Sequence, residues 1–551
     1  MKTRFETSAE KQRGGFYTPD PLVDQALERV AELIDGARGL RVLEPSAGDG
    51  AFIRGLARAH IDESALERVI AVEVNGEEAA RCRSTAATAG LEVEVVEGDF
   101  VKWQATEQSS FDVAVGNPPF VRFQFVEAST KAAASALTRS LLLPEKGVSN
   151  LWLPILLGAV KLLRPGGAFT FVVPGEFFTG VSAGVARSWL VRECDRLDFD
   201  LFPSGQFPGA LQEVMVLSGR RGDRQSTKST LVIHDHRAGG RHWSHEVTDD
   251  AAPWTRYLLS PQQLQAVTVA EGLACVRQLS TVATFEVAAV TGANSYFSVD
   301  PSTVDEFELG PWATPLLPRI RYAPGMVYTA SDHADVSAQG VKSALLDFNA
   351  SRPSPLDADG PREYIEAGEK AGLHQRFKTR TRSPWYRVPL VRVEPLMLSK
   401  RCHRHPRLVL NRAGAVTTDT IYRGWVTDEQ ISAEAITACF HNSLTLLSAE
   451  VEGRSFGGGV LELVPSEVAR LRVPILPEVG AHLPRLDSVS RGEGEPAEVE
   501  HRLVRETNAI LSEAEPALDA DLLREVETAR SDLAQRRFAR NGRVESAAAA
   551  G

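Results

Sequence analysis

The stretch LRVLEPSAGDGAF at residues 40–52 decides the fold. A strand pattern over 40–43 runs into a turn of small residues from Ser46 to Gly50, and a helical pattern begins directly after it. Glycines in such a turn let the backbone approach a ligand closely, and doubly wound α/β folds bind ligands at this carboxyl end of their strands. The stretch therefore predicts a strand, a turn and a helix, with a small-molecule site at the turn.

Short apolar runs on either side of this stretch continue the same alternation. A helix is predicted after Asp20, with this residue as its N-cap and Pro21 at its first position, and another over 151–163. Alternating strands and helices imply a mostly parallel sheet covered on both faces, so the fold class is α/β with a Rossmann-like domain. Beyond 40–43, the predicted strands lie at residues 69–72, 93–96, 112–115 and 168–173.

The chain of 551 residues is longer than the roughly 250–300 residues at which a single core stops growing, so at least two domains are expected. The alternation of strands and helices fades near residue 220, where the polar stretch GRRGDRQSTKS is typical of a linker. We predict a first domain over 1–225, a second, mixed α/β domain over 255–480, and a charged helical tail over 485–551.

Composition limits the location and the metal content. No segment has the pattern of a membrane span or of a secretory signal, which predicts a cytoplasmic protein with no membrane partner. The five cysteines are scattered without a pair at metal or redox spacing. In the cluster Cys402-His403-Arg404-His405 the ligands are too close together for the usual zinc spacing, and the arginines would repel a cation. No metal is therefore expected.

The charge distribution matters more than the net charge. A net charge of −11 by itself argues against a nucleic-acid partner, because duplex binding relies on Lys and Arg at phosphates. Residues 370–412, however, hold twelve Lys and Arg against a single acid, Glu394, and include Phe377, Trp385 and Tyr386. A basic run is usually a solvated face, but aromatic residues within it favour a surface that meets phosphates and bases.

Three acids around the small-residue turn indicate the kind of ligand. Glu44 precedes the turn, Asp49 lies within it, and Glu73 ends the next strand, where an acid can accept hydrogen bonds from ribose hydroxyls. A dinucleotide such as NAD is the alternative, but the turn lacks the third glycine of G-x-G-x-x-G, and Glu44 would lie badly near a pyrophosphate. S-adenosylmethionine carries an ammonium and a sulfonium instead, so the carboxylates favour this methyl donor.

The next two strands end in further candidate side chains. The strand over 93–96 is followed by Asp99 and Phe100, an acid and an aromatic ring that can hold the adenine of the donor. The strand over 112–115 runs into N-P-P-F at residues 117–120. Two consecutive prolines fix φ and remove two amide donors, so this backbone is stiff and its carbonyls are available as acceptors.

The tetrapeptide suits methyl transfer to an exocyclic amino group on a purine, whose lone pair is delocalised into the ring. If the Asn117 side-chain oxygen and the Pro118 carbonyl each accept one amino hydrogen, the nitrogen is drawn towards tetrahedral geometry and its lone pair can point at the methyl group. Pro119 stiffens the turn, and Phe120 offers a face on which an extruded base can stack. A carbon-5 cytosine methylase would need a nucleophilic cysteine, and none lies near the motif.

In their order along the chain, these motifs resemble those of the gamma-class amino methyltransferases of restriction-modification systems, which methylate adenine N6 in DNA. The resemblance covers most of the chain, and LLRPGGAFTFVVP at 162–174 is similar to a later strand of that family. It implies a Rossmann-like methyltransferase domain followed by a target-recognition domain. It also implies S-adenosylmethionine as cofactor and, as substrate, an adenine flipped out of double-stranded DNA.

The resemblance assigns further site residues. FYTP at 16–19 is similar to a motif that closes over the methionine part of the donor. Phe207 resembles the phenylalanine of an F-P motif that packs against the target adenine, although Phe202 heads the same dipeptide five residues earlier. The residues expected at the donor are Tyr17, Thr18, Pro19, Glu44, Ser46, Gly48, Asp49, Gly50, Glu73, Asp99, Phe100 and Asn117.

Three other functions fit parts of the pattern. A cytosine-N4 methylase needs the same activation of an amino group but more often has serine in place of Asn117. A protein glutamine methylase uses a similar N-P-P-Y motif but has no purpose for a basic second domain. A non-catalytic DNA-binding subunit is the third, yet no motif residue is visibly lost. Only about 15 residues precede Phe16, too few for a nuclease domain, so we expect modification without cutting and a separate cognate endonuclease.

Overall fold

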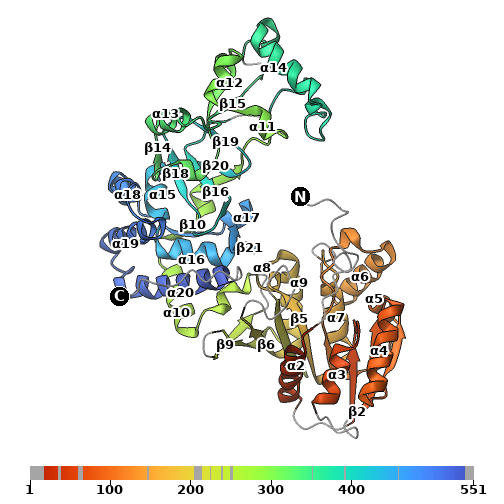
Figure 1. The fold of residues 1–551 in the computed structure, drawn as a ribbon. Helices are drawn as coiled ribbons and strands as arrows, with labels where there is room; N and C mark the ends of the chain where they lie inside the picture. The colour runs from red at the N-terminus through yellow and green to blue at the C-terminus, as the bar shows by residue number, and fades with distance from the viewer. Residues whose placement is uncertain are drawn as a thin grey trace. The chain divides into compact units, whose positions relative to one another are not determined.

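The protein is described by a computed structural model that divides into two compact units (Figure 1). Unit 1 comprises Met1–Pro261 and Phe538–Gly551, and unit 2 comprises Gln262–Arg537. The structure describes residues 18–34, 39–59, 66–144, 148–203, 214–223, 225–237, 240–248, 252–349, 352–389, 392–456 and 458–539.

Unit 1 is built on a nine-stranded sheet with the strand order β3-β2-β1-β4-β5-β7-β6-β8-β9. The first five strands of this order are parallel, whereas β7 runs antiparallel between β5 and β6, and β9 runs antiparallel to β8. The strands are β1 (Leu40–Glu44), β2 (Leu66–Glu73), β3 (Glu94–Glu97), β4 (Phe111–Gly116), β5 (Leu163–Pro174), β6 (Cys194–Leu201), β7 (Val214–Arg221), β8 (Lys228–Asp235) and β9 (Arg241–Thr248).

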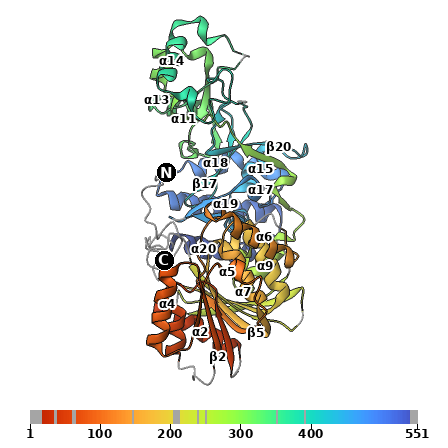
Figure 2. The ribbon, with the colours of Figure 1, turned by 90° about the vertical axis from the view of Figure 1, so that its right-hand side faces the viewer.

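Helices cover both faces of this sheet (Figure 2). On one face α2 packs on β5 and β7, while α4 packs on β2 and β3; on the other, α7 packs on β5 and α9 on β6 and β8. The Rossmann-like α/β class is therefore confirmed, with both faces of the central strands buried. The main helices are α2 (Asp20–Leu33), α3 (Ala51–Arg58), α4 (Gly76–Ala89), α5 (Phe100–Trp103), α6 (Ala128–Ser140), α7 (Trp152–Lys161), α8 (Glu176–Thr179) and α9 (Val181–Glu193).

The predicted strands match β1 to β5, but the start of the first helix was wrong by one residue. Asp20 lies inside α2 and makes no capping bond; Pro19 is the N-cap. The Pro19 carbonyl accepts the N–H groups of Leu22 and Val23, at 3.0 and 3.2 Å, and closes the first turn. The Asp20 carboxylate instead pairs with Arg58 at 3.2 Å.

The sheet continues through the stretch that resembled a linker. Residues 222–227 only connect β7 to β8, and β8 pairs in parallel with β6. Burial alternates along β8 with a period of two, as expected for a strand with one exposed face. Unit 1 therefore extends to Pro261, beyond the predicted limit of 225.

Unit 2 is a mixed α/β structure with several small sheets. Its strands are short, which explains why the sequence looked irregular there. One sheet has the order β11-β20-β16-β18-β14, a second β12-β15-β13-β19, a third β17-β22-β21, and β10 pairs with β23. The strands are β10 (Val276–Gln278), β11 (Ala283–Val287), β12 (Ser298–Val299), β13 (Ala313–Leu317), β14 (Val327–Tyr328), β15 (Ala344–Leu346), β16 (Leu396–Ser399), β17 (Arg401–Cys402), β18 (Leu408–Asn411), β19 (Val416–Thr417), β20 (Ile421–Val426), β21 (Arg454–Phe456), β22 (Val460–Glu462) and β23 (Arg472–Pro474).

Helices lie between and after these strands. Three helices, α18, α19 and α20, follow the last strand. The helices are α10 (Pro261–Glu271), α11 (Asn294–Phe297), α12 (Pro301–Glu306), α13 (Ala330–Ala338), α14 (Asp359–Lys370), α15 (Ala433–Phe440), α16 (Ser443–Glu452), α17 (Pro465–Val468), α18 (Leu483–Ser490), α19 (Pro496–Ala514) and α20 (Ala520–Ala539). Within the described residues, none of the helices combines the length and the apolar character needed to cross a bilayer.

Buried ion pairs attach α19 and α20 to the body of unit 2. Arg537 of α20 is 2 % exposed and forms a two-point pair with Glu450 of α16, at 2.9 and 2.7 Å. Glu500 of α19 pairs with Arg404 at 2.7 Å and with His405 at 2.8 Å. Burial raises the pKa of Glu500, but His405 and the hydrogen bonds outweigh it and lower this pKa to about 2. The Cys-His cluster of the sequence is thus part of a structural ion-pair network.

Removing one partner of the deepest pair tests this anchoring. Arg537→Ala leaves the Glu450 carboxylate buried without its counter-ion, which should lower the free energy of unfolding by about 3–5 kcal/mol. The control, Arg524→Ala, removes an exposed pair with Asp521 on the same helix and should cost less than about 1 kcal/mol. Urea unfolding followed by circular dichroism measures both. Equal small effects would show that the Arg537 pair does not hold α20 in place.

Candidate functional site

The candidate site is assembled at one edge of the sheet of unit 1. The strands β1 to β4 are parallel, so their carboxyl ends meet at the same edge. The turn at 45–50 follows β1, Glu73 ends β2, Asp99 follows β3, and Asn117 follows β4. The structure therefore brings these sequence-predicted residues to one edge, as the strand pattern required.

The turn after β1 is held against β2 and leaves open space beside it. The Gly48 N–H donates to the Glu73 Oε2 at 2.9 Å, and the Ala47 N–H donates to the Val72 carbonyl at 3.1 Å. Gly48 has φ +53°, and a Cβ at this position would have no heavy atom within 4 Å. A glycine is favoured here both by its backbone angle and by the need for a ligand to come close.

The turn encloses an uncompensated acid. Glu44 is 1 % exposed, and its Oε2 is buried without a hydrogen-bond partner among the described residues. Burial, followed by the charges of Asp49 and Glu73, raises its pKa well above the usual value. Burial and the same three acids also raise the pKa of the Cys82 thiol to about 12. The Ser46 hydroxyl is likewise buried and unpaired in the described part of the chain. This edge of the sheet therefore favours a cationic ligand.

Glu73 organises two loops at once. Besides holding Gly48, it accepts the N–H of Asn75 on its Oε1 at 2.8 Å. The next residue, Val74, is 70 % exposed, which is unusual for an apolar side chain at the end of a buried strand. Val74 was not predicted from the sequence, although an apolar residue directly after the acid predicted to bind ribose was a usable signal. It offers an apolar face beside the carboxylate.

Asp99 and Phe100 have different surroundings. Asp99 is the N-cap of α5: its Oδ1 accepts the Val101 N–H at 2.9 Å, and its Oδ2 accepts the Thr130 hydroxyl. Phe100 is 4 % exposed and packs beside Trp103, with ring centroids 5.8 Å apart. The Phe100 ring is thus part of the core.

The N-P-P-F tetrapeptide leaves the sheet at the end of β4. The Asn117 Nδ2 donates to the Thr18 hydroxyl at 3.0 Å, so the N-terminal T-P motif and the tetrapeptide are in direct contact. The Pro119 carbonyl accepts the Val121 N–H at 3.0 Å. Among the described residues, no hydrogen bond uses the Pro118 carbonyl. The half-buried Phe120 packs against the core of unit 1.

Two predicted residues, Tyr17 and Phe207, lie outside the described residues. The alternative to Phe207 is described: Phe202 is 8 % exposed and stacks on His236, with ring centroids 5.3 Å apart and an interplanar angle of 10°. His236 in turn contacts the Asp200 carboxylate at 2.7 Å. Phe202 is therefore committed to packing and not available to a base.

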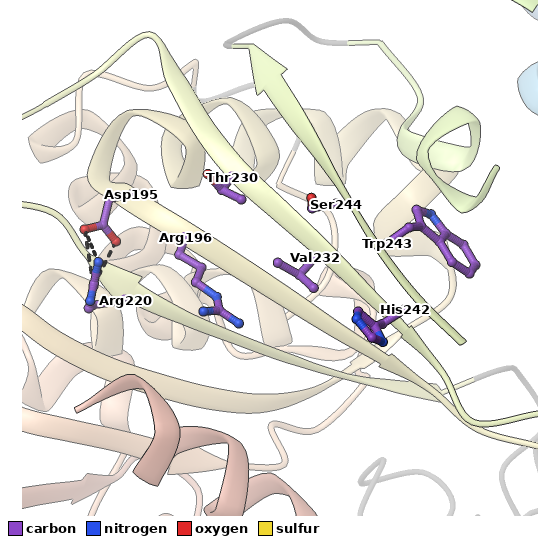
Figure 3. Close-up of a pocket in the computed structure, with 8 residues that line it drawn as sticks. All are labelled: Asp195, Arg196, Arg220, Thr230, Val232, His242, Trp243 and Ser244. Carbon is purple, nitrogen blue, oxygen red and sulfur yellow. Dashed lines mark hydrogen bonds and ion pairs between the residues drawn. The ribbon is translucent and has the colours of Figure 1, made fainter. Parts of the chain in front are cut away.

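A cavity of about 640 Å³ lies over the strands β6, β8 and β9 (Figure 3). It is lined by the beginning of β6 and by parts of β7, β8 and β9. Its two arginines already have carboxylate partners, Arg196 with Asp198 at 2.8 Å and Arg220 with Asp195 at 2.9 Å. The motif residues do not line this cavity, and its paired guanidinium groups offer little to an anionic ligand.

Comparison with known proteins agrees with this arrangement. The fold and the site define a Rossmann-like methyltransferase with an additional mixed α/β unit. Residues 61–200 match the family described as Eco57I restriction-modification methylase, and residues 251–504 match the C-terminal domain of type II methyltransferase M.Eco57I. The chain belongs to this family of restriction-modification methyltransferases.

Named relatives extend over much of the chain. It is 21% identical to the type II methyltransferase M.AccI of Acinetobacter calcoaceticus, covering 83% of this chain and 84% of the relative. With M.TthHB8I of Thermus thermophilus the identity is 28%, but only 45% of this chain and 56% of the relative are covered. The type IIL restriction-modification enzyme MmeI, solved in complex with DNA, is 11% identical with a TM-score of 0.59, covering 96% of this chain and 80% of that one. This last likeness supports the fold.

Replacing Glu44 tests how its burial affects stability. Because its pKa is raised in the folded state, Glu44 supports folding below its unfolded pKa, and this contribution is lost as the pH rises towards the raised value. Glu44→Gln should therefore unfold at a higher temperature than the wild type at pH 8, with the difference shrinking towards pH 5.

Thermal unfolding of the ligand-free protein at several pH values measures this difference. Glu127→Gln, at a side chain that is 81% exposed, serves as the control and should follow the wild type at every pH. A Glu44→Gln variant that is no more stable than the wild type at any pH would show that the carboxylate is compensated.

Proposed function

We propose that this protein is a site-specific DNA methyltransferase that transfers a methyl group from S-adenosylmethionine to the N6 of an adenine flipped out of double-stranded DNA. The observation that carries the proposal is the Asn117 amide, held by Thr18 at the carboxyl end of β4 beside the turn at 45–50. Unit 1 is then the catalytic domain and unit 2 the target-recognition domain. The partner enzyme of such a system is a separate endonuclease that cuts the same sequence when it is unmodified.

The residues at the turn fit the proposed donor. The ammonium and sulfonium charges would complement the cluster of Glu44, Asp49 and Glu73, in which Asp49 is paired with Arg54 at 3.2 Å while Glu44 and Glu73 have no cationic partner among the described residues. The open space at Gly48 leaves room for the methyl donor to lie against the turn. The exposed Val74 provides an apolar surface for the adenine ring of the donor. When bound, the donor supplies an electrophilic methyl carbon. A pyrophosphate would be repelled by the same three acids, which supports the choice over a dinucleotide.

The tetrapeptide then activates the nucleophile. The Asn117 amide nitrogen donates to Thr18, and the amide oxygen is proposed to face the amino group of the target base. The Pro118 carbonyl accepts the second amino hydrogen. Two acceptors at fixed positions draw the nitrogen out of conjugation with the ring, and no covalent enzyme intermediate is needed. Phe120 stacks on one side of the base, and Phe207 is proposed to stack on the other.

Identification of the methylated nucleoside tests the reaction. The protein is incubated with tritiated S-adenosylmethionine and double-stranded DNA, and the DNA is digested and separated by chromatography. Label in N6-methyladenine is expected. Label in N4-methylcytosine would assign the related amino chemistry to cytosine, label in the protein would point to a glutamine methylase, and no label would support a non-catalytic subunit.

Two substitutions in the tetrapeptide region test the assigned geometry. Asn117→Ala removes one preorganised acceptor and should lower kcat by about 10²–10³-fold or more, while the dissociation constant for the donor stays near the wild-type value. Thr18→Val keeps the shape but removes the hydroxyl that holds Asn117, so a smaller loss of kcat is expected. Thr106→Val, at an exposed position of unit 1, is the control. Normal turnover by Asn117→Ala would refute the proposed role.

A further inference from the structure

The basic segment at 370–412 separates into two parts that differ in the partners of their cations. From Lys400 onwards the cations bind partners within the protein. Arg401 pairs with Glu462 at 2.9 Å, and the buried Arg407 donates to the backbone carbonyls of three residues. Before Lys400, Arg382 donates to the carbonyls of 290 and 291. In the part of the chain that the structure describes, six cations form no ion pair and donate no side-chain hydrogen bond: Lys370, Arg376, Lys378, Arg380, Arg387 and Arg392.

The aromatic residues of the segment separate in the same way. Trp385 is 8 % exposed and donates its ring N–H to Glu369 at 2.9 Å. It belongs to a hydrophobic core cluster of unit 2, and the half-buried Tyr386 packs against this cluster. Phe377, in contrast, is 74 % exposed, which places a large apolar ring in water. The Arg380 guanidinium lies over one face of the ring, 5.3 Å from its centroid. Phe377 is therefore presented outward by the fold.

The chain around Phe377 is a fixed turn, which we call the aromatic turn (residues 376–380). The Arg380 N–H donates to the Arg376 carbonyl at 2.9 Å and closes it. The hydroxyl of the fully buried Thr379 donates to the Leu373 carbonyl and, at 3.2 Å, to that of Arg376. These bonds anchor the turn just after α14, in the lobe at one end of unit 2 that contains α11, α12 and α14 (Figure 1). Little conformational entropy remains to be lost when it binds a partner.

We propose that the aromatic turn is a docking element for double-stranded DNA, in which Phe377 inserts as an apolar wedge against the base pairs while Arg376 and Lys378 contact phosphates on either side. Phosphates supply the negative counter-charge that the six cations lack among the described residues. An apolar ring flanked by cations also matches the way proteins place wedges between base steps. The inference rests on the proposed function, since it names the part of unit 2 that holds the DNA substrate. A protein partner would have to bring acids to meet the same cations, and the test below distinguishes it.

Binding of a fluorescein-labelled, mixed-sequence DNA duplex, measured by anisotropy over a series of NaCl concentrations, tests the inference. Phe377→Ala should weaken binding on the order of tenfold or more at every salt concentration, because loss of base–aromatic contact is not screened. Lys378→Ala should also weaken binding but should reduce the slope of log K against log salt by about 1. Val269→Ala, at an apolar residue of α10 that is 52 % exposed, and Arg524→Ala are the matched controls and should change neither.

The outcomes separate this inference from the proposed function. Methyl transfer to DNA by the wild type is measured with the same preparations. Absence of both DNA binding and transfer in the wild type overturns both proposals. Normal wild-type binding that Phe377→Ala leaves unchanged overturns the docking role alone, and an accompanying loss of self-association in sedimentation would reassign the turn to a protein contact. All variants must unfold at the wild-type temperature, which the exposure of Phe377 and Lys378 makes the expected result.

Discussion

The parallel pairing of β4 with β1 is the constraint on which the site depends. The register places Val42 opposite Val113 and Leu43 opposite Ala114, so the two strands end side by side. A Cβ on Gly116 would lie 3.5 Å from Pro45, which shows how closely the two following turns approach each other. One turn surrounds the buried carboxylate, and the other carries Asn117 and Pro118, the proposed acceptors. The distance between the two turns is therefore set by backbone hydrogen bonds inside a buried sheet.

The site is also where the structure tolerates unfavourable electrostatics. A buried carboxylate without a partner opposes folding, and two further acids nearby add to the cost. Other buried charges do have ionic partners: Arg537 is matched by Glu450, and Glu500 by Arg404 and His405. An exception at the edge of the sheet where ligands bind is expected when a ligand of opposite charge completes the site. The imbalance at Glu44 is thus better explained by binding than by stability.

Sequence patterns predicted the alternating buried strands and helices of unit 1, and they missed features that depend on tertiary contacts. Buried parallel strands give runs of apolar residues, so β1 to β5 and the acids at their ends were found. The strands β8 and β9 have one exposed face and mixed polarity, and the polar connection from β7 to β8 resembled a linker. The inward packing of the Phe100 ring follows from its contacts across α5 and α7, which no local pattern encodes. Val74 was missed because exposure of a single residue is a property of the tertiary fold.

The basic segment shows why composition alone does not define a binding surface. All twelve cations count equally in the sequence, yet an arginine that satisfies buried carbonyls, as Arg407 does, cannot also neutralise a phosphate. The two groups differ in the availability of acceptors. From Lys400 onwards the described cations meet acids and carbonyls of their own unit, whereas before it Arg382 meets two carbonyls and the cations of the aromatic turn meet no acid among the described residues. Charge that the fold leaves unpaired must be compensated by water, by salt or by a partner. Around Phe377 an apolar ring is exposed as well, and water is a poor solvent for it. A partner with both phosphates and stacked bases satisfies the two demands together.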